Sequence, residues 1–335
     1  MEVIKVEQLS KTYEYYNKEA GLKGSIKNLF KKEILKKEAV KNINMSIKKG
    51  SIVGFIGMNG AGKTSTLKML SGILKPTSGK IDVLGYDPFE KKPEFLKKIT
   101  MVMGNKSQLW WDIPAVESFE LNRQIFEVNK SDYNKIVGNL IDQLDVRRLT
   151  NVQVRKLSLG ERMKMELIAS LVHSPEIMYL DEPTIGLDII AQQSIRKFLK
   201  DYNREHNNTI ILTSHNFDDI VQLCDYLILV DKGEVIYNDS YENFLDKYSN
   251  KKIIKLKYGE NLGSIIGNIE KNGNLQILEQ DNNIIKLQVD EDKLIDVTRQ
   301  LLIDDVDKIR DISIENLDIK DIIKDIYNGS DVRRE

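Results

Sequence analysis

Cysteine and long apolar runs are almost missing from this chain of 335 residues. Cys224 is the only cysteine, so no intramolecular disulfide can form, and we expect a reducing cytoplasm as its compartment. No apolar run approaches the roughly 18 residues that a helix needs to cross a bilayer. The N-terminal sequence also lacks the basic-then-apolar pattern of a signal peptide. We therefore expect any membrane role to depend on a partner protein.

An excess of charge of one sign and a spacing of aromatic residues suited to base stacking are missing too. The net charge is −1 and only 7% of the residues are aromatic. Neither an overall charge nor a spacing of aromatic side chains favours binding to nucleic acid, and we predict no such partner. The contents of 41% apolar and 30% charged residues are typical of a folded globular protein, and the length allows two domains.

The sequence does contain a glycine-rich segment at residues 57–64, Gly-Met-Asn-Gly-Ala-Gly-Lys-Thr. Its spacing is that of a phosphate-binding loop, in which backbone N–H groups face an anion. The flanking residues predict a buried strand before it and a helix after it, whose N-terminal dipole favours phosphate. We expect Lys63 to reach the β- and γ-phosphates of a nucleoside triphosphate and the Thr64 hydroxyl to ligate Mg²⁺. The predicted phosphate contacts are Gly57, Asn59, Gly60, Ala61, Gly62, Lys63, Thr64 and Ser65.

A second segment places two carboxylates directly after an apolar strand. Residues 177–183 are Ile-Met-Tyr-Leu-Asp-Glu-Pro. Asp181, at the end of the strand, is placed to hold Mg²⁺ directly or through water, and Glu182 could orient or deprotonate an attacking water. A strand followed by an acidic turn is the alternative for this segment alone. The phosphate loop earlier in the same chain argues against that alternative.

The segment Leu-Ser-Leu-Gly-Glu-Arg at residues 157–162 precedes a predicted helix. Ser158 is suited to cap that helix, and Glu161 follows at the spacing of a capping box. The segment could therefore be only a helix start. A helix start with a glycine in its cap region is also an anion site, however.

Apolar runs alternate with helical patterns through the first part of the chain. Strands predicted at residues 177–180, 209–213 and 226–230, with helices between them, imply a parallel sheet wrapped by helices. We predict an edge strand and turn for residues 1–13 and a mostly helical region for residues 95–172.

Two other regions differ from this core. Residues 14–42 are predicted to form a basic insertion, in which residues 18–41 contain eight lysines and three glutamates, a net charge of 8 − 3 = +5. After about residue 245 the pattern changes to short strands, a hairpin turn at residues 281–283 and two helices. This α+β tail has no glycine-rich loop and no catalytic cluster, so we expect an accessory domain for binding or dimerisation.

Five motifs together resemble the ATP-binding subunits of ABC transporters in their order and spacing. They are residues 57–64, 157–161 and 180–182, the segment Gly186-Leu187-Asp188 and the pair Ser214-His215. The resemblance covers about residues 1–240. It implies an α/β fold, a P-loop NTPase of the ABC nucleotide-binding type with antiparallel β and helical subdomains in residues 1–242, followed by a small α+β domain in residues 243–335. It also implies ATP and Mg²⁺ as cofactors and ATP hydrolysis as the activity.

The resemblance assigns site roles as well. Family members form a head-to-tail dimer with ATP between one protomer's phosphate loop and the other's signature loop. Ser158 and Gly160, beside Glu161, would therefore contact ATP held by the Lys63 of the opposite protomer. The second protomer could be another copy or a paired ABC ATPase.

Four other residues receive roles from the same resemblance. Glu182 would activate water, and His215 would hold the γ-phosphate and that water. Asp188 would communicate across the dimer. Tyr13 would stack on adenine, with strand packing as its alternative and Tyr15 and Tyr16 as competitors.

The sequence departs from the family pattern at two places. The usual signature is Leu-Ser-Gly-Gly-Gln, whereas Leu159 and Glu161 occupy its third and fifth positions here. The family's loop glutamine, which meets Mg²⁺ and the membrane subunit, aligns with Asn105. Gln108 is the alternative, and Asn105 is the residue we assign to ATP and the metal.

Finer features resemble exporters of the ABC-2 type that pair with separately encoded permeases. Trp110 and Trp111 lie where the family docks the permease, and they could form an anchor patch or pack in the core. Residues 18–41 could contact anionic lipid or the permease. The expected location is the cytoplasmic face of the cell membrane. A soluble ABC ATPase of the regulatory, repair or translation type is the alternative function.

Two histidines and the single cysteine match none of these motifs. His173 and His206 are expected at the surface, and Cys224 is expected to fill space in the core.

Overall fold

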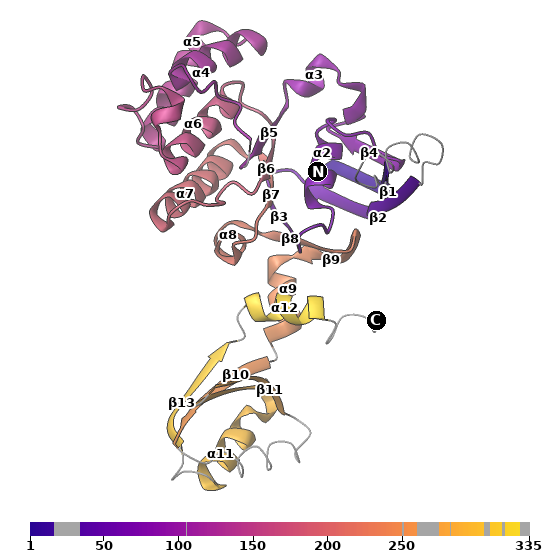
Figure 1. The fold of residues 1–335 in the computed structure, drawn as a ribbon, viewed down its shortest axis with the longest axis vertical. Helices are drawn as coiled ribbons and strands as arrows, with labels where there is room; N and C mark the ends of the chain where they lie inside the picture. Colours follow the sequence, from indigo (N-terminus) through magenta and orange to yellow (C-terminus); the bar gives the residue numbers. More distant parts are fainter. Residues whose placement is uncertain are drawn as a thin grey trace, which may run out of the picture. The chain divides into compact units, whose positions relative to one another are not determined.

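The computed structural model describes residues 1–16, 34–104, 106–249, 251–259, 275–281, 283–304, 309–316 and 319–328. The chain divides into two compact units, Met1–Ser240 and Tyr241–Glu335, which Figure 1 draws as a ribbon. Each unit has its own hydrophobic core.

A six-stranded sheet forms the centre of the first unit. Its order is β5-β6-β7-β3-β8-β9, and all neighbours are parallel except β8 and β9. Strands β3, β6 and β7 are buried at every position, as their continuous apolar sequences require for strands covered on both faces. The strands predicted near residues 177, 209 and 226 are thereby confirmed. The bounds are β3 (Ile52–Gly57), β5 (Ile99–Met103), β6 (Ile177–Asp181), β7 (Thr209–Thr213), β8 (Tyr226–Asp231) and β9 (Glu234–Ser240).

Helices cover both faces of this sheet. Figure 1 shows α4, α5, α6 and α7 on one side and α2 with a smaller sheet on the other. The region predicted as mostly helical, residues 95–172, does contain α4, α5 and α6, but it also contains the strand β5. A five-residue apolar run cannot be told from a piece of helix by its periodicity. The bounds are α2 (Lys63–Leu70), α3 (Pro93–Leu96), α4 (Ala115–Ile125), α5 (Lys130–Gln143), α6 (Leu159–Leu171), α7 (Ile189–His206) and α8 (Phe217–Leu223).

The smaller sheet is antiparallel, with β1 (Glu2–Tyr16) between β2 (Ile34–Lys48) and β4 (Ser78–Val83). The prediction that residues 1–13 form an edge strand is therefore wrong, because both sides of β1 are paired. The ladder of β1 and β2 reaches from Glu2 to Tyr16, so both ends of the predicted insertion, residues 14–42, belong to strands. Residues 17–33 lie outside the described residues.

The second unit is an α+β fold around a four-stranded antiparallel sheet of order β11-β12-β10-β13. Strands β12 and β13 both run antiparallel to β10, which lies between them, and α11 connects them, so they form a split β-α-β unit. Ile254, Leu256 and Leu287 pack with Leu301 of α11 in the core. The bounds are α9 (Tyr241–Ser249), β10 (Lys251–Tyr258), β11 (Leu275–Asp281), β12 (Ile284–Asp290), α11 (Leu294–Asp304), β13 (Ile309–Asn316) and α12 (Ile319–Asn328).

Over the ranges that the structure describes, no helix combines the length and the hydropathy of a membrane-spanning segment.

Candidate functional site

The phosphate loop connects β3 to α2 and has the geometry of an anion cradle. Gly60 and Gly62 have φ angles of 85° and 104°, a region that side chains with a Cβ rarely enter. A Cβ on Gly62 would lie 2.3 Å from the carbonyl oxygen of Ala39, so strand β2 closes against the loop. Among the described residues, a Cβ on Gly60 would meet no atom within 4 Å, so that side of the loop has space for a ligand.

Lys63 is the first residue of α2 and is buried. Its Nζ donates to the carbonyl oxygens of Gly57 at 2.6 Å and Met58 at 3.2 Å, which holds the ammonium inside the loop. Burial lowers the pKa of Lys63, and the negative charges of Glu182 and Asp181 oppose that shift. The cation therefore lies where these two carboxylates partly compensate its lost hydration.

Asp181, at the end of β6, accepts hydrogen bonds from two hydroxyls. Thr64 Oγ1 lies 3.0 Å and 2.9 Å from its two carboxylate oxygens, and Thr213 Oγ1 lies 2.7 Å from Oδ1. Strand β7 lies between β6 and β3, and β3 leads into α2. Because the three strands are parallel, their carboxyl ends bring Asp181, Thr213 and Thr64 together. A carboxylate and a hydroxyl oxygen here are the hard ligands that Mg²⁺ prefers.

Glu182 and His215 meet beside Asp181. His215 Nε2 lies 2.6 Å from Glu182 Oε1, and both side chains are partly exposed. Glu182 has a φ angle of 56°, an uncommon backbone conformation for a residue with a side chain. Its N–H donates to Thr213 Oγ1 at 3.0 Å, which anchors the turn to β7. The two residues predicted to be catalytic are therefore in direct contact.

A buried ion pair supports the segment that contains His215. Arg196 Nε of α7 donates to Asp219 Oδ1 of α8 at 2.6 Å, and both side chains are buried. The hydroxyls of Ser214 and Thr184 each donate to Asp219 Oδ2 at 2.5 Å. Asp219 thus connects the residue before His215 with the turn that follows Glu182.

Lys63, Thr64 and Glu182 line a cavity of about 290 Å³. Tyr13 also lines this cavity, and Tyr13 Oη and Ser65 Oγ are 3.0 Å apart. The competitor Tyr15 is exposed and is not among the lining residues. The lining consists of Tyr13, Lys37, Ala39, Asn59, Gly60, Gly62, Lys63, Thr64, Ser65 and Glu182.

Lys37 is the lining residue that the sequence reasoning missed, because it was counted as part of a basic insertion. It lies directly opposite Tyr13 in the ladder of β1 and β2, so the two side chains share a face of the sheet. The alternation of side chains along β2 places Lys37 and Ala39 together on this cavity. Only the strand register could have revealed Lys37.

The signature residues lie elsewhere in the chain. Ser158 caps α6 in a capping box with Glu161, since Ser158 N donates to Glu161 Oε2 at 2.8 Å and Glu161 N to Ser158 Oγ at 3.3 Å. A Cβ on Gly160 would lie 2.8 Å from Ala191 Cβ, so α6 and α7 approach closely there. Asp188 caps α7. None of these four residues lines the cavity around Lys63.

Asn105 lies outside the described residues. Gly104, before it, donates its N–H to the carbonyl oxygen of Asp181 at 2.8 Å, and a Cβ on Gly104 would lie 2.3 Å from the Glu182 carbonyl oxygen. The alternative residue, Gln108, donates its side-chain amide to the carbonyl oxygen of Met101 at 2.6 Å.

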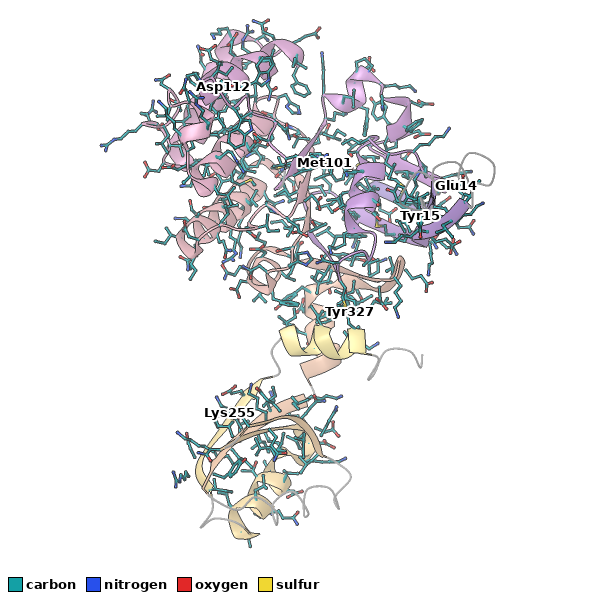
Figure 2. All side chains as sticks on the ribbon, viewed as in Figure 1. Glu14, Tyr15, Met101, Asp112, Lys255 and Tyr327 are labelled. Atoms are coloured by element: carbon teal, nitrogen blue, oxygen red, sulfur yellow. The ribbon has the colours of Figure 1, made fainter. Side chains whose placement is uncertain are left out.

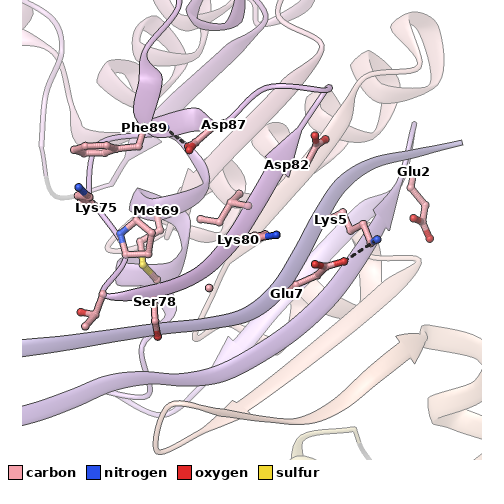
Figure 3. A pocket seen from close by; sticks show the side chains of 14 residues that line it. Glu2, Lys5, Glu7, Met69, Lys75, Ser78, Lys80, Asp82, Asp87 and Phe89 are labelled. Carbon is pink, nitrogen blue, oxygen red and sulfur yellow. Dashed lines mark hydrogen bonds and ion pairs between the residues drawn. The ribbon is translucent and has the colours of Figure 1, made fainter.

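A larger hollow of about 850 Å³ is formed by β1, β4 and neighbouring residues, and Figure 3 shows it. Side chains of both charge signs line it, and Lys5 pairs with Glu7 at 2.8 Å. It shares no lining residue with the phosphate-loop cavity.

Four side chains that lie outside the ATP-site motifs are also placed. Trp110 and Trp111 are 61% and 51% exposed, so core packing does not explain them. The surface prediction for His173 is wrong: its ring stacks on Phe126 at 3.7 Å between centroids, and burial lowers its pKa. Cys224 is buried, and its prediction is confirmed.

Comparisons with known proteins agree with this geometry. The family described as ABC transporter matches residues 40–185. The ABC transporter ATP-binding protein NatA of Bacillus subtilis is 33% identical over 216 residues, covering 64% of this chain and 87% of that protein. The bacitracin transport ATP-binding protein BcrA of Bacillus licheniformis is 29% identical over 264 residues, covering 79% and 81%.

A solved structure extends the similarity to the fold. The cbiO1 protein of Clostridium perfringens, part of the ABC transporter complex cbiONQ, is 27% identical with a TM-score of 0.59, and the match covers 73% of this chain and 92% of that one. The expected α/β fold is confirmed. The chain belongs to the family of ABC transporter ATP-binding proteins and is an ATP-binding and ATP-hydrolysing subunit of an ABC transporter.

Proposed function

We propose that this subunit powers export through separately encoded membrane permeases, with ATP bound between two ATP-binding subunits. The observation that supports the pairing is the division of the site. Lys63, Thr64 and Glu182 line one cavity, whereas Ser158 and Gly160 of the same chain are not among its lining residues. A second copy would supply those two residues, and a paired ABC ATPase is the other candidate.

Each residue then has a chemical role. Lys63 donates to the β- and γ-phosphate oxygens. Thr64 and Asp181, already within hydrogen-bond distance of each other, would hold Mg²⁺, with an amide from Asn105. When bound, Mg²⁺ neutralises charge on the transferring phosphoryl group. Glu182 accepts a proton from the attacking water, and His215, 2.6 Å from it, orients that water and the γ-phosphate.

The nucleoside end of the cavity has its own contacts. Tyr13 would stack on adenine, and its hydroxyl, 3.0 Å from Ser65 Oγ, fixes the ring beside the loop. Lys37, on the same face, would contact the α-phosphate as a point charge. The remaining phosphate contacts are the loop residues Gly57, Asn59, Gly60, Ala61, Gly62 and Ser65, while Glu161 and Asp188 would act across the dimer.

The membrane partner would dock on the exposed Trp110 and Trp111. Large exposed aromatic side chains are typical anchors of protein interfaces. Residues 18–41 could add contact with anionic lipid, so the subunit would lie on the cytoplasmic face of the membrane. Transport by the bacitracin relative supports an export role. The domain limits we propose are residues 1–242 for the ATP-binding domain and 243–335 for the accessory domain.

The test is the substitution Glu182→Gln. It keeps the shape and a hydrogen-bonding oxygen but removes the base, so ATP hydrolysis should fall by a factor of about 10²–10⁴ while ATP binding persists and a dimer accumulates. Glu176→Gln is the control, because Glu176 pairs with Lys98 at 3.1 Å on the surface. Normal hydrolysis by Glu182→Gln would show that another group is the base.

A further inference from the structure

A carboxylate that has no part in the mechanism above is buried on helix α6. Glu166 is only 3% exposed. Its Oε1 accepts a hydrogen bond from Ser107 Oγ at 2.5 Å, and its two oxygens accept from the N–H of Gln108 at 3.1 Å and 3.0 Å. Burial raises the pKa of Glu166, and the bond from Ser107 opposes that rise.

The carboxylate is costly at this position. Removing a charge from water is unfavourable unless hydrogen bonds replace the lost hydration. A leucine would suit the same buried position on α6 without that cost. The contribution of Glu166 therefore lies in its bonds to residues 107–108 and not in its packing.

The other end of this loop is attached to the catalytic edge of the sheet. Gln108 Nε2 donates to the Met101 carbonyl oxygen of β5 at 2.6 Å. Gly104 N donates to the Asp181 carbonyl oxygen at 2.8 Å. In Figure 2, Met101 lies near the middle of the first unit and Asp112 lies toward helices α4 and α6, so Met101 belongs to the sheet and Asp112 to the helical side of the unit.

Helix α6 connects Glu166 with the signature serine. Ser158, Arg162 and Glu166 recur every four residues, so they follow one face of the helix, and two turns separate the first from the last. Arg162 also contacts the loop, since its guanidinium lies 5.2 Å from the ring centroid of Trp111. The loop is therefore attached to this face of α6 at two levels.

We propose that Glu166 is a positioning residue that links the edge of the sheet at Asp181 and Glu182 to helix α6, so that ATP bound in one chain places Ser158 of the same chain for the second protomer. This inference rests on the proposed pairing of two subunits. Without Glu166, the phosphate loop still binds ATP, but ATP binding no longer sets the position of α6.

The experiment uses the full chain with Glu182→Gln, which accumulates the dimer. Glu166→Ala and Glu166→Gln are added separately. Two quantities are measured: the Kd for ATP at a protein concentration where the chain is monomeric, and the ATP-induced dimer fraction by size exclusion with light scattering. Asn122→Ala is the matched control, because Asn122 Nδ2 also bonds to helix α6, at the carbonyl oxygen of Ala169 (2.8 Å), in a bond that involves neither Glu166 nor residues 107–108.

Glu166→Ala should weaken ATP-induced dimerisation at least tenfold and change the monomer's Kd for ATP less than twofold. Glu166→Gln should restore part of the dimerisation, because its amide oxygen still accepts one bond. Asn122→Ala should dimerise like the parent even if its Tm falls equally. Dimerisation of Glu166→Ala equal to that of the parent, or an equal loss in Asn122→Ala, overturns the inference.

Two further results are decisive. If Glu166→Ala does not fold, Ser107→Ala, which removes only one donor, takes its place, and unchanged dimerisation in that variant counts against the inference. If the Glu182→Gln parent itself binds ATP and stays monomeric, the proposed pairing fails, and the inference falls with it.

Discussion

The buried pair of Arg196 and Asp219 allows a quantitative prediction. Arg196→Met keeps most of the apolar stem volume and removes the guanidinium. In the described residues, three side chains donate hydrogen bonds to the Asp219 carboxylate, and this substitution leaves only the hydroxyls of Ser214 and Thr184. Because the Asp219 side chain is 0% exposed, water cannot replace the lost cation.

The expected size follows from this burial. Breaking a buried ion pair by removing one partner costs about 3–5 kcal/mol, since an uncompensated charge remains. For a folded unit of about 150–250 residues, each kcal/mol lowers Tm by about 2–4 °C. Arg196→Met should therefore lower the Tm of the first unit by about 6–20 °C. The rate of ATP hydrolysis should also fall, because Ser214 directly precedes His215.

Differential scanning calorimetry of the full chain measures this effect. Lys92→Met is the control, because Lys92 pairs with Glu90 at 2.7 Å on the exposed surface and its loss should leave Tm unchanged. The double variant Arg196→Met/Asp219→Asn should regain part of the lost stability, because no buried charge remains. A decrease in Tm of less than about 2 °C for Arg196→Met would refute the argument that burial increases the contribution of this ion pair to the free energy of unfolding.

The remaining predictions concern nucleotide, metal and pH. Lys37→Ala should raise KM for ATP about fivefold with kcat unchanged, whereas Lys36→Ala, next to it on β2 and paired with Glu14 at 3.3 Å, should not; a changed kcat would contradict the α-phosphate role. Thr64→Val should increase the Mg²⁺ concentration needed for half-maximal hydrolysis, and an unchanged requirement would exclude Thr64 as a ligand. Burial lowers the pKa of His173, so the unfolded chain takes up a proton more readily than the folded chain as pH falls below about 6.5. Stability is thus present above that pH and lost below it, and His173→Phe should reduce the drop in Tm between pH 7.5 and 5.5.

Some features of this protein could be predicted from neighbouring residues in the sequence, and others depend on residues that are far apart in it. The phosphate loop, the carboxylates at the end of β6 and the capping box of Ser158 and Glu161 could be predicted, because each depends on residues close together in sequence. Strand β5 was not predicted, because a short apolar run cannot be told from a piece of helix by its periodicity. Strand β1 was predicted at a sheet edge, because its sequence does not show that both of its sides are paired. His173 was misplaced because nothing near it in sequence indicates the ring of Phe126.

The sequence by itself determined that this chain holds a triphosphate loop and two carboxylates, because backbone conformation and side-chain chemistry at these motifs are local. Only the tertiary structure decided which distant groups complete the site. Strand register set Lys37 opposite Tyr13. The parallel order of β3, β7 and β6 brought Thr64 to Asp181. The turns after β6 and β7 brought His215 into contact with Glu182. The packing of α6 against the loop after β5 buried Glu166 beside Ser107. Such pairings depend on burial across many residues, which no short stretch of sequence encodes.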